Sequence, residues 1–271
     1  MTDGGGVVGA GGEGVAQVQE VVREVVTTST YSHTTVVLGG GGLSPALVLA
    51  AVLLLAVLAY LWRSGARRDT VLLVGPSGGG KTALYRQLRH GTLGEGTVTS
   101  MRPNEGVFGV HEKFGARRGR KLKVTDFPGH PRLQAGLLHH FPTARKIVFV
   151  VDATNANKKY VIECAQMLYQ TLAAPAVHSA KVPVLLLCNK TDNIRAQSVT
   201  SVLKQLEAEI TVFRDTQGSL DSAGGRDQGA PRFIGAAGTP FRLSQSPSAV
   251  TGAGGSALKG KLEDVVAFLE R

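Results

Sequence analysis

The sequence predicts an α/β fold in which a mostly parallel sheet is covered by helices on both faces, preceded by a single transmembrane helix. Three observations carry this prediction. Apolar runs with strand character alternate with runs of helical periodicity over residues 69–271. A glycine-rich stretch, GPSGGGKT at 75–82, lies between the first strand-like run and the first helix-like run. An uncharged run of twenty residues, 43–62, precedes both. Alternating strands and helices of this kind form parallel sheets with helices on both faces.

Residues 1–42 are rich in Gly, Ser and Thr, and we expect them to be disordered. The stretch VQEVVREVV at 18–26 is an exception, because its valines follow helical spacing. Five β-branched residues make it a weak helix former, so it reads either as a transient helix or as a partner-binding helix.

The run LSPALVLAAVLLLAVLAYLW, residues 43–62, predicts the transmembrane helix. At about 1.5 Å per residue, twenty residues make about 30 Å, the thickness of a bilayer core. Tyr60 and Trp62 suit the membrane interface, and a basic linker, 63–68, follows at once. The positive-inside bias then places the C-terminal part in the cytosol and residues 1–42 across the membrane in the lumen.

Two alternatives to a membrane anchor fit this run less well. A cleaved signal peptide would begin near residue 1 with basic residues, whereas this run begins after an acidic stretch. A buried core helix is rarely so uniformly apolar. The run has no G-x-x-x-G pair and no ionisable group, which favours an anchor over a channel or transport path.

Of the net charge of +10, residues 1–62 carry −3, with four acidic residues against Arg23 alone, and the remainder of the chain carries +13. Such a basic surface suits anionic lipid headgroups or an acidic protein partner. Basic and aromatic residues do not interleave as in nucleic-acid modules, so no direct nucleic-acid binding is expected. The two cysteines, Cys164 and Cys188, lie in helix-like and strand-like runs, which favours free thiols in a reducing compartment.

The glycine-rich stretch fits the phosphate-binding loop (P-loop) pattern G-x-x-x-x-G-K-[ST]. Backbone N–H groups of such a loop point inward around a chain of phosphates, and glycine removes side chains that would block the approach. The lysine would reach the β- and γ-phosphates, and the threonine hydroxyl would bind Mg²⁺. The candidate residues are Gly75, Ser77, Gly78, Gly79, Gly80, Lys81 and Thr82.

A second candidate motif follows the run KLKVTD, whose alternation predicts a strand ending at Asp126. The chain continues as D-x-x-G with Gly129. The carboxylate could hold Mg²⁺ through water, and the glycine backbone N–H could meet a γ-phosphate closely. The turn before this strand predicts an antiparallel pair with the strand expected at 106–112.

The third motif, N-K-x-D, follows the buried run VPVLLLC and consists of Asn189, Lys190 and Asp192. The aspartate carboxylate has two acceptor oxygens, and guanine presents adjacent N1–H and N2–H donors, so Asp192 can pair with both. Adenine presents no such donor pair. Asn189 could bridge the base edge and the phosphate loop, and the Lys190 stem could pack on the base.

Two weaker predictions complete the site. Ser248 and Ala249 are candidates for backbone N–H groups near guanine O6, with a plain small-residue loop as the alternative. In the segment 91–106, which would sense the γ-phosphate, Thr99 or Ser100 is the expected Mg²⁺ ligand, with a solvated loop as the alternative.

The expected elements agree with the predicted fold. The stretch 214–247, rich in Gly, Ser, Asp, Arg and Gln, is expected to be a flexible surface insertion without a clean strand before Ser248. Strands are expected near 70–75, 106–112, 121–127, 146–152 and 182–188, and helices near 82–89, 134–141, 158–173, 196–212 and 258–270.

The order of the three motifs resembles the small Ras-like and Arf-like GTPases over residues 69–271. The variant DFPGH, the single N-terminal span and the long spacing after Asp192 narrow this resemblance to the β subunits of the signal recognition particle receptor. The resemblance implies a GTP-binding anchor in the endoplasmic reticulum membrane, with its GTPase domain in the cytosol. It also implies a heterodimer with the receptor's α subunit, formed through switch loops that respond to GTP.

His130 stands where many such GTPases carry a glutamine that orients the attacking water, so it is the expected catalytic residue. A surface or packing histidine is the alternative. Hydrolysis without an arginine finger is slow, so the resemblance favours a GTP-dependent binding switch over a turnover enzyme. Two other functions stay open, namely an Arf- or Sar-type trafficking GTPase and a membrane tether with structural GTP. A permanent span disfavours the cycling trafficking type.

Overall fold

The computed structural model describes residues 44–63, 68–93, 100–116, 119, 121–221, 233–236 and 238–271. The chain divides into two units, Met1–Ser64 and Gly65–Arg271. In the first unit, the described residues form one helix, α2 (Pro45–Arg63), within the predicted apolar run. A search of the described helices finds none that is long and apolar enough to cross a membrane. The transmembrane span at 43–62 therefore stays a prediction, and the predictions for 1–42 lie outside the described residues.

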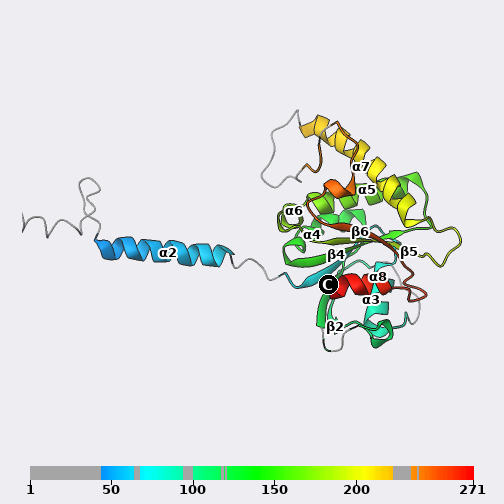
Figure 1. The fold of residues 1–271 in the computed structure, drawn as a ribbon, viewed down its shortest axis with the longest axis horizontal. Helices are drawn as coiled ribbons and strands as arrows, with labels where there is room; N and C mark the ends of the chain where they lie inside the picture. Colours follow the sequence, from blue (N-terminus) through cyan, green and yellow to red (C-terminus); the bar gives the residue numbers. More distant parts are fainter. Residues whose placement is uncertain are drawn as a thin grey trace, which may run out of the picture. The chain divides into compact units, whose positions relative to one another are not determined.

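A six-stranded sheet with the order β2-β3-β1-β4-β5-β6 forms the centre of the second unit (Figure 1). Neighbouring strands are parallel except β2 and β3, which form the predicted antiparallel pair. Every residue of β1 and β5 is buried, as in sheets covered on both faces. The strands are β1 (Thr70–Val74), β2 (Asn104–Gly109), β3 (Lys121–Asp126), β4 (Ala144–Asp152), β5 (Val184–Asn189) and β6 (Val250–Gly254).

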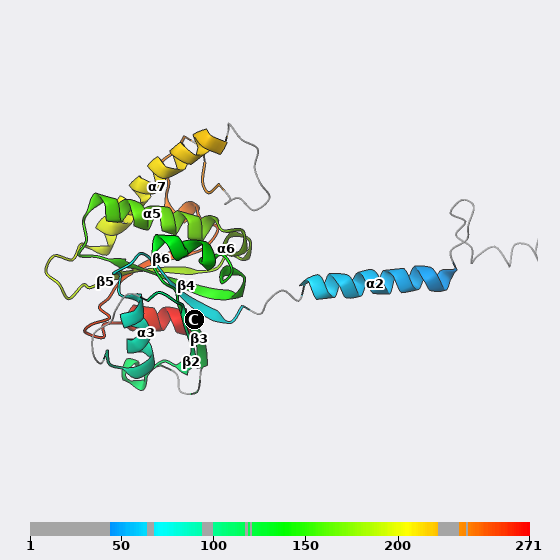
Figure 2. The ribbon, with the colours of Figure 1, turned by 180° about the vertical axis from the view of Figure 1, so that it is seen from behind.

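Helices cover both faces of this sheet, which confirms the α/β part of the predicted fold class (Figures 1 and 2). One face carries α4 (Gln134–Leu137), α5 (Lys158–Ala173), α6 (Pro175–Ala180) and α7 (Val199–Asp221), and the other carries α3 (Lys81–His90) and α8 (Glu263–Glu270). Four short 3₁₀ helices are η1 (Glu112–Phe114), η2 (Pro131–Leu133), η3 (Phe141–Thr143) and η4 (Leu243–Gln245).

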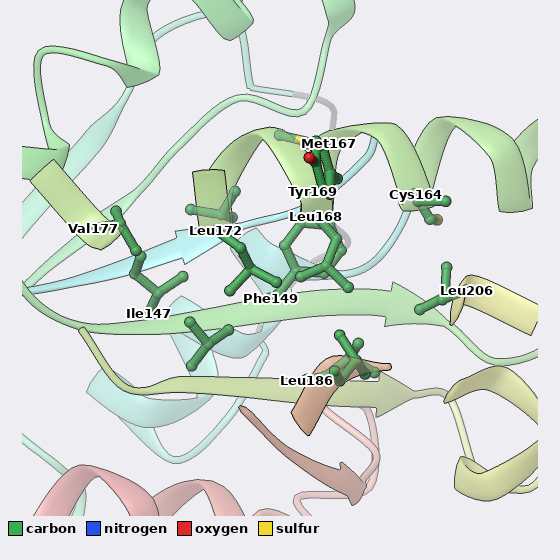
Figure 3. Packing of buried hydrophobic residues seen from close by; sticks show 14 of the residues in the cluster. Ile147, Phe149, Cys164, Met167, Leu168, Tyr169, Leu172, Val177, Leu186 and Leu206 are labelled. Atoms are coloured by element: carbon green, nitrogen blue, oxygen red, sulfur yellow. The ribbon is translucent and has the colours of Figure 1, made fainter. Parts of the chain in front are cut away.

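Alternate residues of each strand supply two separate hydrophobic cores. In β1, Leu72 and Val74 face the core beneath α5, whereas Val71 and Leu73 face the core beneath α3 and α8. Figure 3 shows the first core, where Phe149 of β4 lies against Leu168 and Leu172 of α5. The second unit therefore buries its own strand-forming apolar runs on both faces of the sheet.

Three sequence predictions about the C-terminal third are corrected. A sixth strand, β6, follows Ser248, where none of the five expected strands lies. Helix α7 runs to Asp221, beyond its expected end at 212. The stretch 214–247 is not purely a surface insertion, because Ile234, Phe241 and Leu243 are buried in the core beneath α5. These apolar residues are widely spaced among polar ones, so no periodic pattern shows them in the sequence.

Arg214 on α7 holds the returning part of this stretch in place. Its side chain is wholly buried, which is rare for arginine. The guanidinium donates hydrogen bonds to the carbonyls of Ile234, at 3.4 Å, and Thr239, and its Cζ lies 5.2 Å from the Phe233 ring centroid. The cation therefore joins the end of α7 to the segment that leads into η4.

We expect Arg214→Leu to destabilise the domain by about 3–5 kcal/mol, because it leaves buried carbonyl groups without their donor. In a domain of this size the melting temperature should fall by about 6–15 °C, measured by differential scanning calorimetry. The matched control is Arg242→Leu, which removes an exposed arginine that pairs with Glu207 at 3.0 Å and should cost less than about 1 kcal/mol. Equal losses from the two variants would show that the buried guanidinium has no special role.

Candidate nucleotide-binding site

The three predicted motifs meet at one edge of the sheet. The P-loop follows β1, Asp126 ends β3 and Asn189 ends β5, and these parallel strands all finish at the same edge. Ligands of open α/β sheets bind in the crevice at this edge. A cavity of about 500 Å³ opens there. It is lined by Ser77, Gly78, Gly80, Lys81, Thr82, Ala83, Leu93, Ser100, Asp126, Phe127, Pro128, Gly129, Asn189, Lys190, Asp192, Asn193, Ala257 and Leu258.

Asn189 ties the P-loop to the guanine motif. Its Nδ2 donates to the Gly79 carbonyl at 2.8 Å, and its Oδ1 accepts from the Ala257 backbone N–H at 2.9 Å. Gly80 has φ 94°, and a Cβ at this position would lie 2.3 Å from Asn189 Nδ2. Both the positive φ and the close approach require glycine at position 80.

Lys81, the first residue of α3, lies folded onto the loop that precedes it. Its Nζ donates to the carbonyls of Gly75, at 2.8 Å, and Pro76, at 2.7 Å. Burial lowers the pKa of Lys81 from 10.5 to about 8, although the charge of Asp126 partly opposes this effect. The protein thus keeps a poorly solvated ammonium group in a cavity, where a phosphate anion would stabilise it.

Thr82, Ser100, Asn104 and Asp126 form a hydrogen-bonded cluster beside this lysine. Thr82 Oγ1 donates to Asp126 Oδ2 at 2.7 Å and lies 3.2 Å from Ser100 Oγ. Asn104 Nδ2 donates to the same carboxylate oxygen at 3.1 Å and to Ser100 Oγ at 3.2 Å. The sequence analysis predicted Thr82 and Asp126, and Ser100 as one of two alternatives with Thr99. It missed Asn104, since asparagine at a strand start has no distinctive local pattern.

This cluster fits a hydrated Mg²⁺ ion. The other carboxylate oxygen, Oδ1 of Asp126, is buried in the cavity wall and accepts no hydrogen bond from any described residue. Burial raises the pKa of Asp126, against the opposing hydrogen bonds from Thr82 and Asn104 and the charge of Lys81. A divalent cation would offset that cost, and one carboxylate with hydroxyl groups and water is a typical Mg²⁺ environment.

The D-x-x-G loop lies directly against the P-loop. A Cβ on Gly129 would come within 2.5 Å of both Pro76 C and Ser77 N. All the atoms nearest to such a Cβ belong to the backbone, so neither loop could make room for it without moving as a whole. The two loops are therefore mechanically coupled at the place where a γ-phosphate would be sensed.

Asp192 lines the same cavity, and Ser256 holds its carboxylate from behind the cavity wall. Ser256 Oγ donates to Asp192 Oδ1 at 2.5 Å, which fixes the carboxylate while its other oxygen stays available. Lys190 adopts φ 67°, and its Nζ pairs with Asp152 Oδ2 at 2.5 Å. Hydrogen bonds from Lys190 and Thr154 lower the pKa of Asp152, although burial opposes them. Sequence reasoning missed Asp152, because its partner Lys190 follows the neighbouring strand β5 and no local pattern links the two residues.

Ser248 and Ala249 are not brought to this cavity, so the sequence prediction for them is wrong. They precede β6, and β6 is parallel to β5, so they lie at the opposite edge of the sheet from Asn189. The Ala249 carbonyl accepts from the Val184 N–H at the start of β5. Ser256 and Ala257 take the predicted place. A second Ser-Ala pair, in GGSALKG, was present in the sequence, but without β6 the two pairs could not be distinguished.

Two other predicted residues have different outcomes. Thr99 lies outside the described residues. His130 follows the D-x-x-G loop and does not line the cavity; its Nδ1 accepts from the Arg132 backbone N–H at 3.3 Å, at the start of η2. The water-positioning role of His130 therefore stays a prediction.

This fold and this order of loops define a small GTPase-like domain, with a phosphate loop after the first strand and an N-K-x-D loop after the fifth. Residues 66–250 match the family described as "Signal recognition particle receptor beta subunit". The chain belongs to this family, as its motifs predicted.

Curated relatives agree with this assignment. The signal recognition particle receptor subunit beta of Mus musculus is 34% identical over 210 residues, which cover 75% of this chain and 76% of the relative. The subunit of the same name from Homo sapiens is 36% identical over 209 residues, covering 76% and 74% of the two chains.

Solved structures show the same fold. The structure titled "The Structure of the Mammalian SRP Receptor" superposes with a TM-score of 0.61 at 32% identity, covering 74% of this chain and 98% of that chain. The SRb-GTP/SRX complex from Chaetomium thermophilum gives a TM-score of 0.59, with coverage of 76% and 98%. At 22% identity, that second likeness supports the fold alone.

Proposed function

We propose that the domain binds GTP with Mg²⁺ in the cavity at the carboxyl ends of β1, β3 and β5. The single observation that carries this proposal is that Asp192 lines the same cavity as Lys81 and Thr82. Its position would pair it with guanine N1–H and N2–H while the P-loop holds the phosphates. Gly75, Ser77, Gly78, Gly79, Gly80 and Gly129 would supply backbone contacts to the phosphates, and Thr82, Ser100 and Asp126 would hold the hydrated ion.

The bound nucleotide acts as a signal for partner binding. Gly129 touches the P-loop backbone, so a γ-phosphate beside it would change the D-x-x-G loop and the surface next to it. In keeping with the family, the partner is the α subunit of the signal recognition particle receptor. The protein would thus hold that subunit for co-translational targeting, in a GTP-dependent heterodimer formed through the switch loops.

The sequence supports a membrane location for this complex. The uncharged run 43–62 would anchor the protein as a single span in the endoplasmic reticulum, with residues 1–42 lumenal, 63–68 a basic linker and the GTPase domain cytosolic. Such a span is permanent, unlike the reversible helix of a cycling GTPase. His130 would orient water for a slow intrinsic hydrolysis.

The partner proposal is tested by a pulldown of the receptor α subunit with the full chain reconstituted in detergent. The chain loaded with a non-hydrolysable GTP analogue should retain the α subunit at least tenfold more strongly than the chain loaded with GDP. Thr82→Ala, which removes the candidate Mg²⁺ ligand, should abolish this difference. Equal recovery in the two nucleotide states would reject GTP control while leaving nucleotide binding, measured separately by fluorescence titration, intact.

A further inference from the structure

The parallel strands of the domain carry a row of cations at the edge opposite the nucleotide cavity. Arg68 precedes β1, Lys121 begins β3, Arg145 is the second residue of β4, and Lys181 precedes β5. All four residues are exposed. Each lies at the amino end of a different strand, whereas Asp126 and Asn189 of the nucleotide site lie at the carboxyl ends.

The strand register places these four residues at nearly the same level. Thr70 of β1 pairs with Lys123 and with Ala144, so Arg68 and Lys121 each lie two residues before a paired position. Ile147 pairs with Val184, which aligns the start of β4 with the segment around Lys181. The strand order β3-β1-β4-β5 makes the four strands neighbours, about 4.8 Å apart. The row is therefore continuous across the sheet edge.

Arg68 is fixed in this row by its own hydrogen bonds. Its Nη1 donates to the Ala144 carbonyl at 3.3 Å and its Nη2 to the Ala176 carbonyl at 3.1 Å. These bonds tie the entry of the chain into the domain to the start of β4 and to α6. They neutralise no charge, because both acceptors are backbone carbonyls. The first residues of the domain thus belong to the cationic edge.

The end of α8 adds a fifth cation to the same edge. Lys146 Nζ donates to the carbonyls of Phe268, at 2.6 Å, and Leu269, at 3.2 Å, which fixes the end of α8 beside the start of β4. Arg271, which is separated from Leu269 by Glu270, is exposed. Asp69 and Glu270 are the acidic residues next to these positions in sequence. Positive charge therefore predominates among the described residues of the edge.

We propose that this edge of the domain, defined by Arg68, Lys121, Arg145, Lys181 and Arg271, docks on anionic lipid headgroups. The proposal rests on the membrane anchor proposed above. Only residues 64–67 separate the end of α2 from Arg68, and five peptide steps reach at most about 18 Å. A headgroup surface is therefore the anionic partner within reach of this edge. The nucleotide cavity and its loops, at the opposite edge, would face the cytosol and a protein partner.

The test uses the full chain in vesicles of phosphatidylcholine alone or with 30% phosphatidylserine. A fluorescent label on Ala180→Cys, beside Lys181, reports contact with a lipid headgroup quencher, and a label on Ile194→Cys reports from the opposite edge. Both positions are exposed, and the natural cysteines are buried. We expect strong quenching of the Ala180→Cys label on anionic vesicles only, and weak quenching of the Ile194→Cys label on both.

The charge variant Lys121→Gln, Arg145→Gln, Lys181→Asn keeps Arg68 and its hydrogen bonds. Asparagine suits position 181, where φ is 50°. Each lost cation should weaken docking about fivefold, so the triple variant should lose about 100-fold. The matched control removes three exposed lysines elsewhere, as Lys158→Gln, Lys159→Gln, Lys204→Gln, and should keep the quenching.

Each failure has its own signature. If the chain no longer floats with vesicles after carbonate extraction, the proposed membrane anchor is rejected. In that case, charge-dependent flotation of the untreated full chain on anionic vesicles would still test whether the cationic edge binds lipid headgroups. Equal quenching of the Ala180→Cys label on both vesicle compositions would overturn the docking proposal. Equal quenching of the label in the charge variant and in its control would also overturn the docking proposal, since the edge would then bind another polyanion or none.

Discussion

Asp192→Asn is expected to lower the affinity for GTP by about 100- to 10,000-fold and to create affinity for xanthosine triphosphate. The carboxylate would accept two charge-assisted hydrogen bonds from guanine, each contributing about 1.5–3 kcal/mol. The asparagine amide replaces one acceptor by a donor, which opposes guanine N2–H but matches the carbonyl that xanthine carries at C2. Fluorescence titration with labelled nucleotides measures both changes.

The variant should fold normally. Asp192 is exposed, and the asparagine Oδ1 can still accept from Ser256 Oγ. Inosine triphosphate, which lacks the 2-amino group, supplies the control on the ligand side. The wild-type chain should prefer GTP over inosine triphosphate by at least about tenfold, and this preference should vanish in Asp192→Asn. If the preference persists, the carboxylate does not read the base.

The residues of this site differ in how far the sequence could predict them. The P-loop, Asp126 and the N-K-x-D motif each depend on a few consecutive residues after a strand, so spacing alone identified them. Asn104, Asp152 and Ser256 act on partners 22, 38 and 64 residues away along the chain. Their roles follow from strand order and register, which no local pattern specifies.

The same difference explains the misplaced Ser-Ala pair. The edge strand β6, VTGAG, contains two glycines and a single buried residue, so it lacks both the alternation and the apolar run that indicate a strand. Only its pairing with β5 defines it. Without that strand, Ser248 and Ser256 are equivalent in sequence, although β6 carries the chain from one edge of the sheet to the other between them. Arg214 was missed for a related reason, because charge patterning treats arginine as a surface residue.

Lys81→Met is expected to affect nucleotide binding and domain stability in opposite directions. Lys81 is 6% exposed and its pKa is lowered to about 8, which corresponds to a cost of about 3 kcal/mol for the charged form in the nucleotide-free domain. Methionine fills a similar volume without that charge, and removing the cost of the buried charge offsets the loss of the hydrogen bonds to the Gly75 and Pro76 carbonyls. The variant should therefore bind GTP at least about 100-fold more weakly but melt no lower than the wild-type domain.

The pH dependence of stability distinguishes this prediction from a general destabilisation of the domain by the substitution. Because the folded-state pKa of Lys81 lies below its unfolded value of 10.5, the unfolded chain binds more protons between about pH 8 and 10.5, and the nucleotide-free wild-type domain should gain stability across that window. Lys81→Met should lose this gain, as followed by calorimetry. Lys146→Met is the matched control, since Lys146 is also buried but donates to the last carbonyls of α8 at the opposite edge. Lys146→Met should lower the melting temperature and leave GTP affinity unchanged. If Lys81→Met also lowers the melting temperature, Lys81 stabilises the fold and is not held at a cost for phosphate binding.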